Sequence, residues 1–552
     1  MKKKRPIRLL SFLSGMCFAL PFLLRSALSA PIAYFSGIPA LLLLFSLLTD
    51  GTERKPFFFL RMGFYFSFGY YIGVYHWFLY MYPLDFIADF SALEAAGVVF
   101  VALVGLSLVA TACFTFIIPN VALLYRTRPC KERVLLLPLL FASVFTVFSY
   151  LISFTWMGVP WGMIAITQAP LPALAMTSSL FGSYFVTFIV VLTGGFLALA
   201  LLRYYRTRRE NGAQAHRNAV KRAALPGILA LSVFFVNLAA GCALYLIPHT
   251  ENDSMTATLV QGNVTSREKW NGVGEDLFTR YDRLVSSLED SGSDLIIWSE
   301  TAITTGLDST PASLDGQSVR AWLSELAKKT NAAQLVGHFS YEGTGEDGKT
   351  YNTLSLVNRD GTLHGNVYHK RHLVPFGEYV PMKPVIDTLL PFMSELVLMN
   401  EFTPGTDSKV FDTEHGKLGA LICFDSIYEE LARDATKDGA EILIISTNDS
   451  WFDDSIALYQ HNAQAVLRAM ENGRYVLRCA NTGISSVITD KGDVIASLAP
   501  NVEGVITEEV PLYGYETLYT RIGNLFVYLN IAALLALPTL DVILRLKERK
   551  AT

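Results

Sequence analysis

Long apolar stretches separated by short polar linkers fill the first 250 residues of the chain, and one more follows residue 518. A helix that crosses a lipid bilayer needs about 20 mostly apolar residues, and each stretch reaches that length. The pattern therefore predicts seven membrane-spanning helices before a polar region and one after it. The predicted spans are residues 8–28, 31–49, 57–81, 95–124, 134–153, 176–202, 224–247 and 523–544.

The first predicted span follows the basic N-terminus MKKKRPIR and therefore looks like a secretory signal peptide. The sequence SALSAPIA is a poor cleavage site, because Pro31 would follow the cut, and six further spans come before the polar region. We therefore expect residues 8–28 to be retained as a span.

The polar region alternates short apolar runs with amphipathic ones. The segment EDLFTRYDRLVSSLED places Leu277, Tyr281, Leu284 and Leu288 on one helix face, and SVRAWLSELAKKT and SIALYQHNAQAVLRAMENGR have the same spacing. Strands that are apolar throughout and alternate with helices are typical of an α/β domain with buried sheets. The predicted strands are ATLVQGN, SDLIIWSE, AAQLVGHF, NTLSLVN, LGALICF, EILIISTND and YVLRCANTG.

The composition agrees with this division of the chain. Of the 552 residues, 51% are hydrophobic and 17% are charged, which is too apolar for an ordinary soluble protein. The expected domains are a membrane domain over residues 1–249, a polar domain over residues 250–518, and a final transmembrane helix with a basic tail over residues 519–552.

Lysine and arginine gather in every second linker, among them RYYRTRRENGAQAHRNAVKR and the C-terminal RLKERK. The intervening linkers MYPLDFIADFSALEA and SFTWMGVPWGMIAITQAP contain neither residue. Basic linkers stay on the cytoplasmic side of a membrane. Seven crossings then place residues 250–518 outside the cytoplasm, and we expect a multi-pass protein of the cytoplasmic membrane.

Two classes of partner are not expected. The formal net charge is −4, and the polar region has no lysine- or arginine-rich tract interleaved with aromatic residues, so nucleic acid is not an expected partner. No CxxC spacing occurs, and His369 and His372 have no evident third ligand, so the sequence does not predict a metal site.

Cys423 lies where the apolar run LGALI meets the acidic, helix-like segment that follows it. A helix beginning there, capped by Asp425 or Ser426, would bring the positive end of its dipole to the sulfur and favour the thiolate. Two other interpretations are open: Cys423 packs as a small core residue, or it forms a disulfide with Cys479, the other cysteine of the polar region.

Two more polar residues mark the ends of predicted strands or follow them. Glu300 closes LIIWSE, and Lys370 lies in NVYHKRHLVPFGEYVP, where a basic residue could equally be solvated. Chemistry in α/β domains gathers at strand ends. A carboxylate can take the proton of a thiol, and an ammonium can stabilise the oxyanion formed when the sulfur attacks an acyl carbon. Glu300, Lys370 and Cys423 would together suffice for acyl transfer.

The order IIWSET, YHKRHLVPFGEYVP, LICFDSIYEE resembles the Glu–Lys–Cys triad of the nitrilase superfamily. More narrowly, KRHLVPFGEYVP, QGN, STNDSWF, YQH and ENGRYVLRCANTGIS resemble the apolipoprotein N-acyltransferase family over the whole chain. The resemblance implies an α-β-β-α sandwich outside the cytoplasm, held by a helical membrane domain. It also implies transfer of an acyl chain from a phospholipid to the α-amino group of the diacylglyceryl-modified N-terminal cysteine of a lipoprotein.

The resemblance assigns roles to residues of this chain. Cys423 would be the nucleophile and carry the acyl group as a thioester, Glu300 the general base and later the acid, and Lys370 the oxyanion stabiliser. Glu378 matches a supporting carboxylate. The positions that match substrate-binding or mobile segments are Trp161, Trp270, Asn352, Trp451 and Arg474, and the aromatic ones could instead only anchor the protein at the lipid interface.

The sequence departs from the family pattern at three positions. Ser299 stands where the family commonly has proline, and Phe424 and Asp425 stand where it commonly has Tyr-Glu. Phe424 lacks the hydroxyl, and Asp425 keeps the charge on a shorter side chain. The triad is intact, so we expect an active enzyme that works without a cofactor, as a monomer. The alternatives are a membrane-tethered amidohydrolase that uses water as acceptor and a non-enzymatic scaffold.

Overall fold

The protein is described by a computed structural model that covers residues 7–84, 90–154, 158–210, 215–271, 274–343, 348–389 and 401–551. The chain forms two compact units. The first unit contains residues 1–79, 97–247 and 522–552, and the second contains residues 80–96 and 248–521.

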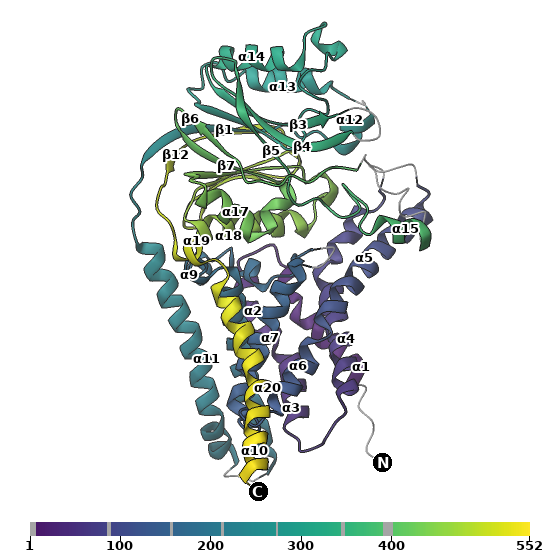
Figure 1. Ribbon diagram of the computed structural model, residues 1–552, viewed down its shortest axis with the longest axis vertical. Coiled ribbons are helices and arrows are strands. Elements are labelled where there is room, and N and C mark those ends of the chain that lie inside the picture. The colour runs from purple at the N-terminus through teal and green to yellow at the C-terminus, as the bar shows by residue number, and fades with distance from the viewer. Residues whose placement is uncertain are drawn as a thin grey trace. The chain divides into compact units, whose positions relative to one another are not determined.

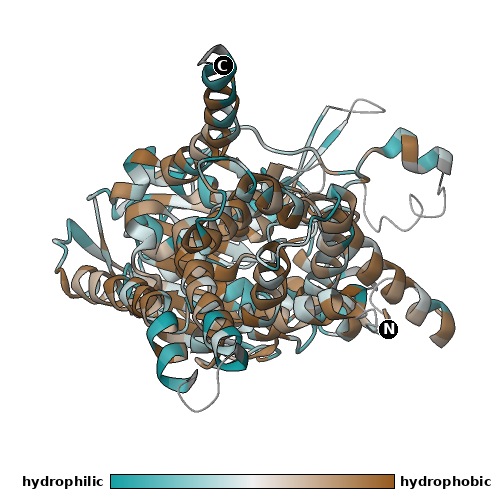
Figure 2. Cartoon of the chain, turned by 90° about the horizontal axis from the view of Figure 1, so that it is seen from below, coloured by the Kyte–Doolittle hydropathy of each residue, from teal (hydrophilic) through white to brown (hydrophobic). Residues whose placement is uncertain are grey.

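The first unit is helical, and its helices are formed mainly by hydrophobic residues, drawn brown in Figure 2. Among the described residues, six helical segments are long and apolar enough to cross a membrane: Ser29–Leu48, Ala92–Tyr125, Val134–Phe154, Ser183–Arg209, His216–Leu246 and Leu525–Arg549. Its main helices are α1 (Ile7–Phe18), α2 (Ser29–Ser36), α3 (Ile38–Leu48), α4 (Pro56–Val74), α5 (Ala92–Phe114), α6 (Ile117–Tyr125), α7 (Leu137–Leu151), α8 (Pro172–Ala175), α9 (Ser178–Phe181), α10 (Ser183–Glu210), α11 (Ala215–Leu246) and α20 (Leu525–Ala551).

Two expected spans differ from the prediction. The segment 8–28 is not one long helix, because α1 ends at Phe18 and a 3₁₀ turn, Leu20–Leu23, with Pro21 in its first turn follows. Twelve helical residues rise about 18 Å, which is less than the roughly 30 Å of hydrocarbon in a bilayer. Helix α4 has 19 residues, but Arg61 and several tyrosines and glycines lower its hydropathy.

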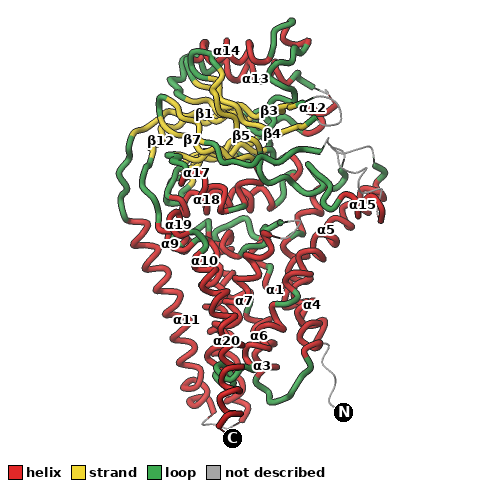
Figure 3. Tube along the Cα trace, viewed as in Figure 1, coloured by secondary structure: helices red, strands yellow, loops and turns green. Residues whose placement is uncertain are grey.

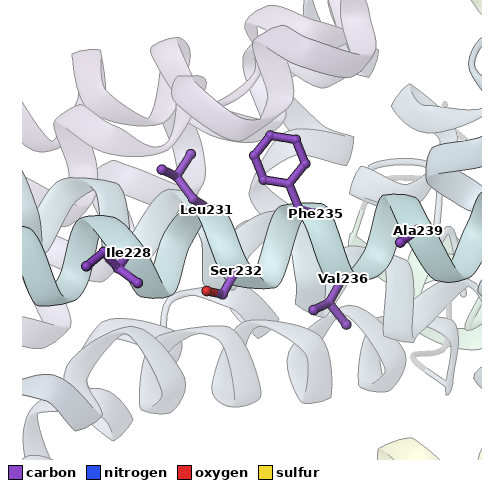
Figure 4. Close-up of a pocket in the computed structure, with 6 residues that line it drawn as sticks. All are labelled: Ile228, Leu231, Ser232, Phe235, Val236 and Ala239. Atoms are coloured by element: carbon purple, nitrogen blue, oxygen red, sulfur yellow. The ribbon is translucent and has the colours of Figure 1, made fainter.

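Helix α11 exposes an apolar face (Figure 4). The side chains around a shallow pocket on it are Ile228, Leu231, Ser232, Phe235, Val236 and Ala239. Four of them are large, apolar and more than half exposed. A surface of this kind suits contact with lipid chains, in line with a multi-pass membrane protein.

The second unit contains two six-stranded sheets, shown as yellow tubes in Figure 3. The strand order is β12-β1-β2-β3-β4-β5 in the first sheet and β11-β10-β9-β8-β7-β6 in the second. The strands are β1 (Asp253–Gln261), β2 (Leu295–Trp298), β3 (Ala333–Glu342), β4 (Lys349–Val357), β5 (Leu363–His369), β6 (Val410–Thr413), β7 (Gly416–Ile422), β8 (Ile442–Thr447), β9 (Val476–Ala480), β10 (Ser485–Ile488), β11 (Val494–Leu498) and β12 (Gly504–Leu512).

The two sheets have the same pattern of pairing. In the first, β1, β2 and β3 are parallel and the outer pairs are antiparallel. In the second, β7, β8 and β9 are parallel and the outer pairs are again antiparallel. The parallel strands of both sheets therefore end on one edge each, where loops can carry functional side chains.

Helices cover the outer face of each sheet, which gives four layers (Figure 1). The covering helices are α13 (Leu277–Ser286) and α14 (Val319–Thr330) on the first sheet and α17 (Glu429–Lys437) and α18 (Ile456–Asn472) on the second. The same part of the chain also contains α12 (Ser266–Asn271), α15 (Lys383–Leu389) and α19 (Leu518–Ile522). One core lies between the sheets and includes Leu259, Ile297, Ile422 and Ile444. A second, which includes Trp298 and Trp322, lies under α13 and α14. The α-β-β-α sandwich expected from the sequence is confirmed.

All seven predicted strands are present, but five others were not predicted. Four of those five, β5, β6, β11 and β12, form the edges of the two sheets, and β10 lies next to an edge. Strand β11 alternates between exposed and half-buried residues. An edge strand lacks the continuous apolar run by which a central strand is identified, and this explains why the four edge strands were missed. Strand β10 is buried, but it has only four residues and begins with two serines.

The helix expected to begin at Cys423 is a short 3₁₀ turn, η8 (Cys423–Ile427), and the α-helix α17 starts only at Glu429. Asp425 does not cap α17. Its carboxylate accepts a hydrogen bond from the backbone N–H of Ile422, at 3.2 Å. The acidic residue therefore closes the turn that holds the cysteine.

Candidate active site

Three strands end at the residues that the sequence singled out. Glu300 follows β2 by two residues, Lys370 follows β5 directly, and Cys423 follows β7 directly. Lys370 and Glu300 form an ion pair, and both interact electrostatically with the Cys423 thiol. The structure therefore brings the three side chains into one site, with two from the first sheet and one from the second.

The turn that carries Glu300 is tight. Thr301, the next residue, has a φ of 45°, which is rare for a β-branched residue. Gly337 on β3 allows this turn to come close, because a Cβ atom there would lie 2.4 Å from the Ser299 carbonyl oxygen. Strained backbone of this kind persists where the surroundings hold it in place, and it is frequent at active sites.

Lys370 is buried between two carboxylates. Its Nζ lies 3.0 Å from Oε1 of Glu300 and 2.9 Å from Oε1 of Glu378. The Nδ2 of Asn352 donates to the same two oxygens, at 2.7 Å to Glu300 and 3.2 Å to Glu378. The remaining oxygen of Glu300 accepts from the backbone N–H of Asn448, at 2.7 Å. The four side chains form one continuous network.

The network keeps Lys370 charged. Burial lowers the pKa of Lys370, but Glu300 and then Glu378 raise it well above the ordinary value of a lysine. A buried charge is tolerated when it is paired and hydrogen-bonded. The ammonium is therefore a fixed positive charge beside the thiol.

Cys423 occupies a left-handed backbone conformation, with a φ of 48°. Residues other than glycine seldom adopt it. Immediately before it, β7 is buried in the core between the sheets. The sharp turn directs the cysteine out of the strand, and the residue keeps part of its surface exposed.

The resting cysteine is a thiol. Burial raises the pKa of Cys423 well above its ordinary value, and Glu300 raises it further, while Lys370 and the Thr447 hydroxyl lower it. The expected preference for thiolate at a helix N-terminus is therefore outweighed. A thiol in this state needs a base to take its proton, and Glu300 is a carboxylate that interacts with it directly.

Asp425 joins the turn of the cysteine to the loop of the lysine. Its carboxylate accepts hydrogen bonds from the backbone N–H groups of Arg371 and His372, at 3.2 and 2.8 Å, and from the Tyr368 hydroxyl, at 2.8 Å. Burial raises the pKa of Asp425 to about 6, although its donors lower it. Phe424 is buried and packs edge to face on Tyr428, with the ring centroids 5.6 Å apart.

The other residues suggested by the resemblance are placed differently. Asn352 lies in the network. Trp451 lies in the 3₁₀ turn η9 (Ser450–Phe452), and this turn begins directly after Asn448 and Asp449. Arg474 donates to the backbone carbonyls of Ala440 and Gly473 and lies over the ring of Tyr515.

Trp161 is outside this network. Trp161 belongs to the first unit, where it is buried 5.5 Å from the ring of Trp77. The side chain of Trp270 lies outside the described residues.

The disulfide alternative is wrong, since Cys423 and Cys479 are both free. Cys479 is fully buried, and its sulfur lies 3.3 Å from the Val260 carbonyl oxygen and 3.2 Å from that of Ile297. It is a core residue between the sheets.

The sequence interpretation missed Lys269, one residue before Trp270. Its Nζ donates to the carbonyl oxygen of Glu300, at 3.3 Å, and to the Thr301 hydroxyl. Burial lowers the pKa of Lys269 to about 7, and Glu300 opposes the shift. A lysine one turn into a charged helix looks solvated in sequence, and only its burial against the Glu300 turn marks it.

A buried cluster behind Cys423 was also missed. It consists of Asp449, His461 and Arg478, which come from the loop after β8, from α18 and from β9. The motifs STND, YQH and VLRC contain them and were noted for other reasons. Nothing in their spacing shows that the three side chains meet.

Two family models and several solved structures are similar to parts of this chain. Residues 256–518 match the carbon-nitrogen hydrolase family, and residues 14–196 match the N-terminal domain of apolipoprotein N-acyltransferase. Among solved structures, Saccharomyces cerevisiae Nit3, of the nitrilase superfamily, aligns with 50% of this chain and 97% of its own, at 21% identity and a TM-score of 0.37.

Two curated relatives carry the same name. The apolipoprotein N-acyltransferase of Geobacter metallireducens is 30% identical over 529 residues, which cover 95% of this chain and 93% of that protein. That of Nitrosomonas europaea is 28% identical over 406 residues, which cover 72% and 73% of the two chains.

Proposed function

Because the chain belongs to the apolipoprotein N-acyltransferase family, we propose that it N-acylates apolipoproteins through a thioester on Cys423, with Glu300 and Lys370 as its partners. Membership makes the chain an acyltransferase with lipid substrates and a multi-pass membrane protein. The observation that supports the mechanism best is the buried Lys370 ammonium, shared by Glu300 and Glu378 and electrostatically coupled to the thiol.

The first half-reaction forms the acyl-enzyme. Glu300 takes the proton of the Cys423 thiol, and the sulfur attacks the ester carbonyl of a phospholipid. The oxyanion that develops is stabilised by the Lys370 ammonium. The carbon–oxygen bond then breaks, and the lysophospholipid leaves with the proton that Glu300 held. The products are a thioester and a free lysophospholipid.

The second half-reaction transfers the acyl group to an amine. The α-amino group of the diacylglyceryl-modified cysteine attacks the thioester, and Glu300 takes a proton from it. The carbon–sulfur bond breaks, and the proton returns to the sulfur. Oδ1 of Asn352 is buried and has no hydrogen-bond partner among the described residues, so it offers an acceptor for an amine N–H.

The substrates and the location belong to the same proposal. The donor is a phospholipid, and the acceptor is a diacylglyceryl-apolipoprotein. The alternation of basic and neutral linkers supports a place in the cytoplasmic membrane with residues 250–518, the catalytic domain, on the outer side. Residues 1–249 and 519–552 then tether that domain, as a monomer, close to membrane-bound substrates, which raises their effective concentration.

Intact-mass spectrometry of the purified full-length protein tests the proposal. Incubation with phospholipid alone is expected to add one fatty-acyl mass, and subsequent addition of a diacylglyceryl-lipopeptide is expected to remove it as N-acylated peptide. Release of free fatty acid at the same rate without the lipopeptide would instead support a hydrolase. Absence of any mass gain would contradict the thioester mechanism.

A further inference from the structure

Three ionisable side chains form a fully buried cluster behind the nucleophile. Nδ1 of His461 lies 2.9 Å from Oδ1 of Asp449, and Nη2 of Arg478 lies 2.7 Å from its Oδ2. Each side chain is at most 1% exposed. Although burial raises the pKa of Asp449, Arg478 and then His461 lower it to well below the ordinary value, so the carboxylate stays charged.

The cluster reaches the backbone of Cys423. Nε2 of His461 lies 3.3 Å from the Cys423 carbonyl oxygen and 3.1 Å from the Ser426 hydroxyl. That hydroxyl donates to the same carbonyl, at 2.7 Å. The left-handed conformation of Cys423 is therefore held from behind by His461 and Ser426. An imidazole of His461 that cannot move holds the carbonyl group of Cys423 in place. Because that carbonyl belongs to the same residue, the direction of the Cys423 side chain is held as well.

The cluster is also close to the sulfur. The Sγ atom of Cys423, a carboxylate oxygen of Asp449 and a ring nitrogen of His461 all lie within 4.8 Å of one another. A thiol, an imidazole and a carboxylate could together hold a soft metal ion. Here both oxygens of Asp449 are occupied, one by His461 and Thr447 and the other by Arg478. The guanidinium beside them opposes a dication, so hydrogen bonding is the better use of the cluster.

We propose that Asp449 and His461 are positioning residues, which hold the Cys423 turn in the geometry that aligns its thiol with Glu300 and Lys370. The proposal rests on the function proposed above and adds to it a second set of side chains on which acyl transfer depends. Arg478 keeps Asp449 charged, Asp449 orients the imidazole of His461, and His461 holds the Cys423 carbonyl. None of the three takes part in bond making.

The test compares two reactions of Cys423 in the full-length enzyme. Acylation by a p-nitrophenyl ester, read as intact mass, needs an aligned thiol and an oxyanion site. Alkylation by iodoacetamide needs only a thiolate that the reagent can reach. In His461→Leu, acylation is expected to fall about 100-fold, while the alkylation rate at high pH changes by less than about threefold. His461→Gln, which keeps a donor, is expected to lose less.

Asp449→Asn separates positioning from charge. The charged and titratable groups around the sulfur are Glu300, Lys370, Asp449 and His461, and Arg478 is paired with Asp449. Because the Asp449 carboxylate raises the pKa of the thiol, its loss is expected to move the alkylation profile to lower pH. Acylation is nevertheless expected to fall, because the imidazole is no longer fixed. A purely electrostatic role would make acylation faster at neutral pH.

The matched control is His338→Gln. His338 is another buried histidine of this unit, with Nδ1 2.7 Å from the Phe339 carbonyl oxygen and Nε2 2.9 Å from the Ser355 hydroxyl. It is expected to affect both reactions equally or not at all. A folded His461→Leu protein that acylates at the wild-type rate would overturn the proposal. So would a parallel loss of acylation and alkylation, which would indicate general damage.

Failure of the proposed function gives a different result. If the wild-type enzyme reacts with the p-nitrophenyl ester but gains no acyl mass from phospholipid, the donor assignment is wrong. The comparison of His461→Leu with the wild type still decides the positioning role. If His461→Leu does not fold, Asp449→Asn and His461→Gln decide it in the same two reactions.

Discussion

The two sheets of the second unit share one architecture and contribute different chemistry to the site. The first sheet supplies Glu300 and Lys370, and its part of the site depends on one ammonium shared by two carboxylates. The second supplies Cys423, and its part depends on a strained turn braced by a buried ionic cluster. The same arrangement of parallel strands therefore supplies charged groups from the first sheet and a positioned nucleophile from the second. The side chains, rather than the fold, decide what each sheet contributes.

This difference has a consequence for substitutions. In the first sheet, a neutral side chain of similar shape removes the charge on which the chemistry depends and keeps the position of the side chain, although the buried partners of that charge are left unpaired. In the second, a change that keeps the thiol can still remove its alignment. The four changes below probe the comparison in order of decreasing expected effect.

Cys423→Ala, in the part of the site that the second sheet supplies, should abolish acyl transfer. The nucleophile has no substitute, so acyl-enzyme formation should fall by about 10⁴-fold or more. Intact-mass spectrometry after incubation with phospholipid measures it. Cys479→Ala, at the buried core cysteine, is the control and should still gain the acyl mass. Acylation of the Cys423→Ala protein would show that another residue carries the acyl group.

Glu300→Gln, in the part of the site that the first sheet supplies, should identify the base. The amide cannot take the thiol proton, so the rate of acylation should fall by about 10³-fold. Glu378→Gln touches the same Lys370 nitrogen and should cost about tenfold, because that carboxylate only supports the ammonium. Single-turnover acylation measures both rates. Equal losses in the two variants would mean that the carboxylates share the role of base.

Lys370→Met should affect rate and stability together. Loss of the oxyanion partner should slow acylation by about 10²-fold to 10³-fold. Two buried carboxylates would remain without their cation, which costs about 3 kcal/mol of unfolding free energy. The double variant Lys370→Met/Glu378→Gln should recover part of the stability and none of the rate. Denaturant unfolding in detergent, combined with single-turnover acylation, measures both, and recovery of the rate would contradict the role of Lys370.

Lys269→Met should change the pH dependence of stability more than the rate. Because the folded pKa of Lys269 is about 7 and its ordinary value is 10.5, the unfolded chain binds the extra proton between these values. The wild type should therefore gain stability as pH rises from about 7 to 10.5, by about 5 kcal/mol at most. Lys269→Met should lose that slope, while Lys328→Met, at an exposed lysine of α14, should keep it. Identical slopes in wild type and Lys269→Met would contradict the burial of a neutral amine, and acylation should change by less than about tenfold.

Much of the fold was predictable because burial leaves a mark on the sequence. Central strands such as β2 and β8 are buried at every residue and contain a run of apolar side chains, and α13 and α14 show one apolar face. Edge strands were missed because none of them is buried along a continuous run. The span 8–28 was predicted too long because hydropathy does not register where a proline ends a helix.

The candidate site was predictable only in part. Glu300 and Cys423 stand at the ends of apolar runs, where a polar residue is conspicuous. Lys370 follows β5, an edge strand that the pattern did not reveal; its chemistry made it a candidate oxyanion stabiliser, but only the resemblance favoured that role over a solvated lysine. Lys269 and His461 lie on helices among other polar residues, and nothing in their spacing distinguishes them from solvated side chains.

The sequence by itself determined that apolar helical stretches flank a polar α/β region, and which residue types stand at the ends of its strands, because these depend on hydropathy and on neighbours along the chain. Only the tertiary structure decided that Lys370 joins Glu300 and Glu378, and that His461 supports Cys423. It also decided that the thiol is protonated at rest. These properties depend on the distances between residues that lie 8 to 123 positions apart in the sequence and on the exclusion of water from the site. The spacing of neighbouring residues encodes neither the distances nor the exclusion of water.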